Sequence, residues 1–207
     1  MKRYIKNSFE LGADVIHRAS IIIDIDVPYT IAAATRWTDY TRFPGAEQFR
    51  LDVLDMLANE FKFDVMDDNY NGVTQKGWTS KHQDSDSIYF NTFYDLRNAE
   101  ELFRDKNYGI DPANVSGKVF CYILFRFSDH DVDSRFDLGH RNFYEANKQK
   151  HTDSRNDVLL HRDENIIIDE AALQQHYKDA LDDLRYELEN RIAGWVRYAK
   201  RRYPEGV

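Results

Sequence analysis

Residues 118–127 read KVFCYILFRF, a run in which apolar and aromatic side chains occupy both alternating faces of an extended chain. A strand that is apolar on both faces is typical of the interior of a sheet. The run therefore predicts a central strand over 118–127. Cys121, the single cysteine, lies within it, so we expect a buried thiol rather than a nucleophile. One cysteine makes no internal disulfide, which fits a reducing cytoplasm.

Shorter strands are expected elsewhere in the chain. Residues 15–27, VIHRASIIIDIDV, end in alternating apolar and acidic positions, the period of a strand with one buried face. Residues 73–79 and 87–94 have the composition of strands and are joined by a polar stretch. Residues 67–72, DDNYNG, are a turn by composition. Ile166–Ile168 form a brief strand or the approach to the last helix.

Helical periodicity marks several further segments. Residues 46–61 carry apolar side chains at spacings of three and four, with Asp52 and Asp55 on the opposite face. An alanine-rich stretch after Pro28 predicts a helix over 29–40. Residues 98–104 predict a short helix, and a further short helix is expected over 141–150.

The longest predicted helix ends the chain. Asp169 is a suitable N-cap, apolar residues recur at helical spacing from Leu173 to Ala199, and Pro204 stops the pattern. A continuous helix of this length measures about 50 Å, more than the diameter of a small domain. It would therefore bend near Gly194 or project toward a partner.

These elements predict the α+β class: an antiparallel or mixed sheet packed with helices, ending in a long amphipathic C-terminal helix. Residues 1–168 form an acidic body, and residues 169–207 form a helix that packs on it or extends from it. The 207 residues include 13 Phe, 13 Tyr and only 4 Pro, which indicates one folded domain. No apolar run reaches the about 20 residues of a membrane span, so we expect a cytoplasmic protein with no membrane contact.

Charge is unevenly distributed along the chain. The net charge is −8, but residues 191–207 hold five bases and one acid, so the rest of the chain carries −12. Such a body is repelled by nucleic acid and attracted to basic protein surfaces, where carboxylates imitate phosphates. The alternative is a face that serves solubility alone. The candidate partner-binding residues are Asp52, Asp55, Asp64, Asp67, Asp68, Asp129, Asp133 and Asp137.

The basic end of the last helix has two interpretations. Arg197, Lys200, Arg201 and Arg202, interleaved with Trp195 and two tyrosines, have the composition of a weak nucleic-acid contact through phosphates and stacking. The same cations also complement the helix dipole at its C-terminus, which is the simpler explanation and the one we favour.

Carboxylates and imidazoles gather over residues 129–140. Asp129, His130, Asp131, Asp133, Asp137 and His140 are residue types found in hydrolytic metal sites. A metal-dependent nuclease or phosphoesterase would use His130, Asp131, Asp133 and His140, but their spacing matches neither an EF-hand nor HExxH. Phosphate-binding loops and a GxSxG elbow are absent, so no cofactor is expected and a non-enzymatic role is favoured.

Residues 1–9, MKRYIKNSF, resemble the starts of small accessory proteins of plasmids and conjugative elements in Gram-positive bacteria. Some of those proteins are anti-defence factors, including inhibitors of type II-A CRISPR nucleases. The resemblance implies an RNA-guided nuclease such as Cas9 as partner, because such enzymes hold guide RNA and DNA in positively charged channels. The acidic body would block such a channel while the basic helix end contacts guide RNA.

Three hypotheses therefore remain open. The first is an inhibitor, encoded on a mobile element, that binds a basic nucleic-acid-processing protein, specifically an anti-CRISPR protein. The second is the metal-dependent nuclease or phosphoesterase built on residues 129–140. The third is a structural or assembly protein that forms a homodimer or larger oligomer through the last helix.

Overall fold

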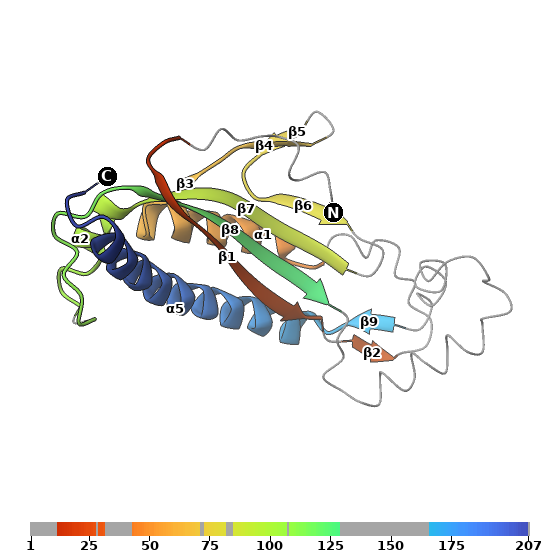
Figure 1. Cartoon of the computed structure of the whole chain (residues 1–207). Coiled ribbons are helices and arrows are strands. Elements are labelled where there is room, and N and C mark those ends of the chain that lie inside the picture. Colours follow the sequence, from red (N-terminus) through yellow and green to blue (C-terminus); the bar gives the residue numbers. More distant parts are fainter. Residues whose placement is uncertain are drawn as a thin grey trace, which may run out of the picture.

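The structure is a computed structural model that describes residues 12–27, 29–31, 43–70, 73–81, 85–106, 108–128 and 166–206. Strands alternate with short helices before one long helix closes the chain (Figure 1). The elements are β1 (Val15–Asp26), β2 (Tyr29–Ile31), α1 (Ala46–Asp55), the π-helix η1 (Met56–Glu60), β3 (Asp64–Val65), β4 (Asp68–Tyr70), β5 (Val73–Gln75), β6 (Trp78–Lys81), β7 (Ser85–Asp95), the 3₁₀ helix η2 (Leu96–Asn98), α2 (Ala99–Leu102), β8 (Lys118–Ser128), β9 (Ile166–Ile168) and α5 (Glu170–Arg202).

The main sheet is mixed and contains five strands. Its order is β1-β8-β7-β3, and β6 also pairs with β7. β1 runs parallel to β8, whereas β7 is antiparallel to β8, β3 and β6. β8 therefore lies inside the sheet, which confirms the prediction of a central strand over 118–127. The predicted α+β class with a mixed sheet and a C-terminal helix is also confirmed.

One face of the sheet is covered by α1 and α5, and the core lies between them. Alternate side chains of β8 point into this core and are almost completely buried: Val119, Cys121, Ile123, Phe125 and Phe127. Phe49 of α1 contacts Phe125 edge-on, with ring centroids 4.9 Å apart. Burial of each large apolar side chain stabilises the fold by about 1.5–3 kcal/mol.

α5 packs along the sheet over its whole length. Asp169 caps it as predicted, because its side chain accepts a hydrogen bond from the Ala172 N–H at 3.0 Å. Buried side chains recur from Leu173 to Ala199, so the length of α5 is accommodated against the sheet. The helix is continuous through Gly194.

The opposite face of β8 is less buried than the face that the helices cover. Phe120, Tyr122 and Leu124 on that face are only partly buried, whereas their neighbours in the chain are fully buried. The continuous apolar run therefore marks a central strand with one helix-covered face, not a strand with both faces sealed. We call the side of the sheet away from α1 and α5 the open sheet face.

Three local predictions are corrected by strand pairing. Residues 29–31 belong to β2, not to a helix, because they pair antiparallel with Ile166–Ile168; residues 32–40 lie outside the described part. Residues 68–70 form β4 paired with β5, where a turn was expected. The strand predicted over 73–79 is divided at Gly77, whose φ of 66° is the left-handed conformation that favours glycine.

No helix within the described part has both the length and the apolar character that crossing a membrane requires.

Candidate protein-binding surface

The outer sides of α1 and α5 form one surface because the two helices are joined at several points. The rings of Phe49 and Tyr177 stack, and the Tyr177 hydroxyl donates a hydrogen bond to the Pro44 carbonyl at 3.0 Å. Farther along, Arg185 of α5 donates to Glu60 at the end of η1 at 2.9 and 3.2 Å. These contacts hold the two helices side by side on one face of the sheet.

Exposed carboxylates line this surface. Residues 46–60 contain four acids and one base, and residues 170–190 contain six acids and two bases, so the two helical segments together carry −7. We define the acidic helical layer by five exposed aspartates of these helices: Asp52, Asp55, Asp179, Asp182 and Asp183.

Most of these carboxylates are held by neutral neighbours. Asp52 accepts a hydrogen bond from the Gln48 amide at 2.7 Å, and Asp179 accepts one from the Gln175 amide at 2.8 Å. An amide fixes the orientation of a carboxylate without cancelling its charge. Asp182 is the exception, since it forms an ion pair with Arg185 at 3.0 Å. The layer therefore presents net negative charge on rigid helices.

The acidic residues predicted from sequence do not all lie in this layer. Asp52 and Asp55 do. Asp64 is the cross-strand neighbour of Phe93, which places it on the open sheet face. Asp68 accepts hydrogen bonds from the Asn91 amide at 3.1 and 3.2 Å, and its pKa is raised because burial disfavours the charged form. Asp67 is exposed on the loop between β3 and β4.

Three aspartates of α5 were not among the predicted partner-binding residues. Asp179, Asp182 and Asp183 are exposed and lie outside the buried stripe that includes Ala180 and Leu184. Their spacing of three and four was visible in the sequence as an acidic stripe on an amphipathic helix. What the sequence did not show is that this stripe lies beside α1, more than 120 residues earlier in the chain.

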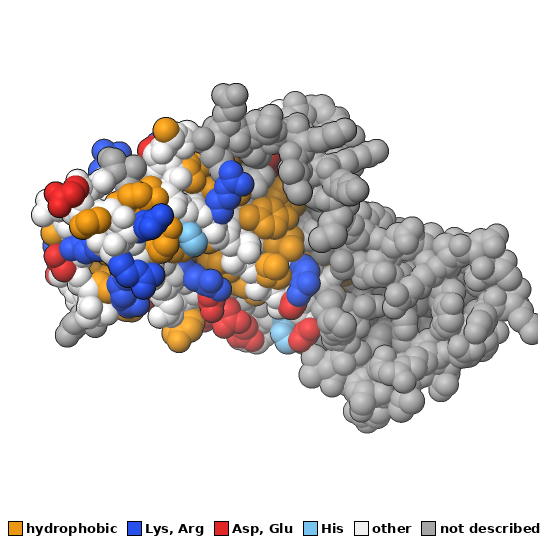
Figure 2. Space-filling model, viewed as in Figure 1, with side chains coloured by type: hydrophobic (Ala, Val, Ile, Leu, Met, Phe, Trp, Pro, Cys, Tyr) orange, Lys and Arg blue, Asp and Glu red, His pale blue; other side chains and the backbone are white. Residues whose placement is uncertain are grey.

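The open sheet face combines aromatic and charged side chains. Phe93 and Phe120 meet with ring centroids 5.5 Å apart, and Tyr89 and Tyr122 meet at 5.8 Å. Ile22 of β1 is 52% exposed on the same face. Figure 2 shows hydrophobic side chains next to basic ones over this part of the molecule. On this face Asp14 and Asp24 form ion pairs with Lys118 and Arg126.

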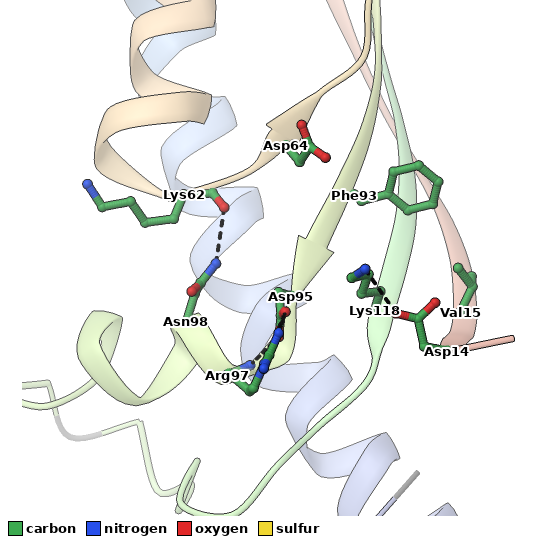
Figure 3. A pocket seen from close by; sticks show the side chains of 9 residues that line it. All are labelled: Asp14, Val15, Lys62, Asp64, Phe93, Asp95, Arg97, Asn98 and Lys118. Atoms are coloured by element: carbon green, nitrogen blue, oxygen red, sulfur yellow. Dashed lines mark hydrogen bonds and ion pairs between the residues drawn. The ribbon is translucent and has the colours of Figure 1, made fainter. Parts of the chain in front are cut away.

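A shallow pocket of about 450 Å³ lies at the end of the open sheet face where β7 ends and β8 begins (Figure 3). Lys118 forms an ion pair with Asp14 at 2.9 Å, and Arg97 forms a forked ion pair with Asp95. The hydrogen bond from Arg97 lowers the pKa of Asp95, so both partners are charged at neutral pH. Lys118 and Arg97 are thus already paired with carboxylates.

The basic end of α5 is only partly available for binding. Lys200 forms an ion pair with Asp111 at 2.7 Å. Arg197, Arg201 and Arg202 are exposed and make no ion pair within the described residues. Trp195, which we expected to take part in base stacking, is 4% exposed and packs near Tyr94 in the core. A nucleic-acid contact here would rest on three arginines without that ring.

Two further predictions concern chemistry. Cys121 is a buried strand residue as predicted, and burial raises the pKa of its thiol to about 12. Among the described residues no group of three or more His, Cys, Asp or Glu side chains is placed to hold a metal ion. The predicted helix over 141–150 lies outside the described ranges. So do all the residues predicted between 129 and 140, namely Asp129, His130, Asp131, Asp133, Asp137 and His140. The metal-site hypothesis stays a prediction.

Comparison of the chain with protein-family models, with curated proteins and with solved structures found no match.

Proposed function

We propose that this chain is a non-enzymatic inhibitor that binds a basic, nucleic-acid-processing protein through the acidic helical layer. The observation that carries the proposal is the placement of Asp52, Asp55, Asp179 and Asp183 on neighbouring helices that are fixed to one sheet face. Several carboxylates on a rigid support can occupy a groove that otherwise holds phosphates.

Charge gives such a surface speed and selectivity. Opposite potentials steer two proteins together and raise the association rate, and like charge rejects nucleic acid itself. The segments that form the layer carry −7, while the +4 of residues 191–207 is confined to the end of α5 and the tail. The two charged regions would engage different parts of one ribonucleoprotein: a basic protein groove and an RNA backbone.

The first partner to test is an RNA-guided nuclease of type II, since the resemblance of residues 1–9 implies an anti-CRISPR protein. Such a nuclease has a positively charged channel for nucleic acid and reads its target-adjacent motif with arginines. Both are surfaces that the aspartates of the acidic helical layer would cover. Binding there would compete with DNA and would require no catalysis by this chain.

The test is equilibrium binding of the full chain to Cas9, with and without guide RNA, at low and at moderate salt. The triple variant Asp52→Asn, Asp179→Asn, Asp183→Asn removes three charges from the acidic helical layer and keeps the shape of each side chain. The matched control is Asp64→Asn, Asp67→Asn, Asp105→Asn, which removes three charges outside the layer.

We expect the layer variant to weaken binding by about tenfold or more and the control by much less, because close charge pairs contribute more than distant ones. Salt should weaken the wild-type complex by reducing its association rate. Absence of binding in either state of the nuclease at low salt would reject this partner. An equal loss in both triple variants would reject the acidic helical layer as the contact surface.

A further inference from the structure

β1 forms an outer edge of the main sheet. Among the described strands its one neighbour is β8, with which it pairs in parallel from Val15 to Asp26 (Figure 1). Every second residue of an edge strand directs its N–H and C=O groups away from the sheet. β1 therefore offers one of the longest strands of the molecule as a template for another strand.

The middle of this edge has little protection against pairing. Residues 19–23 read ASIII and contain no charge, proline or glycine, and Ile22 is 52% exposed. Natural edge strands are usually blunted by such residues or covered by another element. The nearest charges lie on either side of the stretch, at Arg18 and at Asp24.

We propose that a second copy of this chain covers the edge, with two β1 strands pairing antiparallel about a twofold axis at Ile21. Arg18 and Asp24 lie on the same open sheet face at equal distances from Ile21. The twofold therefore places each Arg18 opposite Asp24 of the second copy. A twofold interface must be self-complementary, and these two residues satisfy that requirement twice.

The register follows from strand geometry. Side chains alternate between the two faces of a strand. In an antiparallel pair of identical strands, two opposed residues therefore lie on the same face only when the sum of their residue numbers is even. Centring the pair on Ile21 opposes residues 16–26 of both copies, and the only other even sum that gives as long an overlap within β1 is centred on Ser20. Centring one residue earlier opposes Arg18 to Ile22 and loses the charge pair.

In this register, side chains of β1 and β8 would also lie next to compatible side chains of the second copy. Asp24 already accepts hydrogen bonds from Arg126 of β8 at 2.6 and 2.8 Å. In the dimer its carboxylate would lie between Arg126 and the Arg18 of the second copy, so one acid would bridge two cations. Ile22 would lie between Ser20 of the second copy and Leu124, its partner on β8.

The long helices would match as well. α5 runs antiparallel to β1, since Tyr198 contacts His17 near the start of the strand and Tyr177 contacts Phe127 near its end. A twofold at Ile21 would therefore set the two α5 helices antiparallel. The basic end of each, residues 191–202, would face toward the acidic part of the other, residues 170–189. This charge arrangement favours the same orientation as Arg18 and Asp24.

Charge reversal with mixing tests the proposal. We would measure the mass of the full chain by light scattering and sedimentation over a wide concentration range. Arg18→Asp alone and Asp24→Arg alone each place like charges opposite each other in a homodimer, so each should raise the dimer dissociation constant by about tenfold or more. Mixing the two variants should restore a heterodimer, because the carboxylate introduced at position 18 then faces the guanidinium introduced at position 24.

Arg126→Ala is the control, since it removes the partner of Asp24 within the subunit but leaves the edge intact. This variant should remain dimeric with a modestly weaker affinity. Circular dichroism would verify that all variants are folded. A wild-type chain that stays monomeric up to its solubility limit, or variants that dimerise as tightly alone as when mixed, would overturn the proposal.

Crosslinking tests the register. Ser20→Cys mixed with Ile22→Cys should give an oxidised heterodimer, because these positions are opposed when Ile21 is the centre. Cys121 is fully buried and does not compete. Efficient crosslinking of Ile22→Cys with itself would instead centre the pair on Ile22 and reject this register. Absence of crosslinks in a chain that still dimerises would move the interface away from β1.

Discussion

The ring of Phe49 on α1 stacks on the ring of Tyr177 on α5, with centroids 4.8 Å apart and planes inclined by 18°. The residues are separated by more than 120 positions in the chain, and both rings also contact β8 through Phe127. This contact joins the two helices that carry the acidic helical layer to the sheet. The stability of the fold and the geometry of the proposed binding surface therefore depend on the same side chains.

Phe49→Ala should lower the free energy of unfolding by about 3–5 kcal/mol, the usual cost of emptying a buried aromatic site. Phe49 is 2% exposed, so little of the cavity can fill with solvent. Leu51→Ala in the same helix is the control: Leu51 is exposed, and its loss should cost about 0.5 kcal/mol. Denaturant titration would measure both. Equal effects would show that α1 is not held by the Phe49 site.

Tyr94→Phe should stabilise the protein by about 1 kcal/mol. The Tyr94 hydroxyl is buried and has no hydrogen-bond partner among the described residues, lying in a pocket with Phe63 and Trp195. Burial also raises the pKa of this phenol, so it remains neutral. Removing an unsatisfied polar group relieves its desolvation cost.

Tyr177→Phe provides the opposite case. The Tyr177 hydroxyl donates a hydrogen bond to the Pro44 carbonyl at 3.0 Å, so its removal should destabilise by about 0.5–1.5 kcal/mol. Thermal unfolding of Tyr94→Phe and Tyr177→Phe, measured in parallel, would show whether the two substitutions change stability in opposite directions. Destabilisation by Tyr94→Phe would mean that the hydroxyl has a partner, such as a buried water.

Gly77→Ala should destabilise through both the backbone and a steric clash. Gly77 has φ of 66°, and a Cβ at this position would lie 2.6 Å from Cζ of the buried Phe90. Left-handed backbone costs about 1–2 kcal/mol for a residue with a Cβ, and overpacking adds about 1–3 kcal/mol.

Gly109→Ala separates these two contributions. Gly109 has a similar φ of 63°, but among the described residues, its chain neighbours aside, no atom lies within 4 Å of the position that an added methyl group would take. Its substitution should therefore show the backbone cost alone, and the difference between the variants reports the clash with Phe90. Equal destabilisation in urea titrations would show that the Phe90 ring moves aside freely.

The sequence predicted the elements whose patterns are local and repeated. α5 and α1 were found because their apolar residues recur every three or four positions, and β8 because its apolar run is long. β2 was missed because residues 29–31 are a strand only in combination with Ile166–Ile168, far along the chain. Pairing with a distant segment overrides local helix propensity.

Contacts between distant segments also determine which residues form the candidate surface. Asp52 and Asp55 of α1 were each predicted as partner-binding residues. Because they are close in sequence to Asp64 and Asp68, the prediction grouped these four residues, but Asp64 and Asp68 lie on the open sheet face. The structure groups them instead with the aspartates of α5, through contacts such as that between Glu60 and Arg185. Which carboxylates share a face is set by helix packing, and helix packing leaves no signal in residue spacing alone.

Glu189 of α5 should make the free energy of unfolding depend on pH in the acidic range. Burial disfavours its charged form, but hydrogen bonds from Lys106 and Tyr108 outweigh that effect and lower its pKa below the ordinary value of 4.5. A carboxyl with a lowered folded-state pKa stabilises the fold above its unfolded pKa and loses this contribution as pH falls through the folded value. The difference in unfolding free energy between wild type and Glu189→Gln should therefore be constant above pH 4.5 and shrink below it. Tyr108→Phe, which removes one of the two donors, should reduce the acid dependence without abolishing it, and a difference that grows on acidification would contradict the assignment.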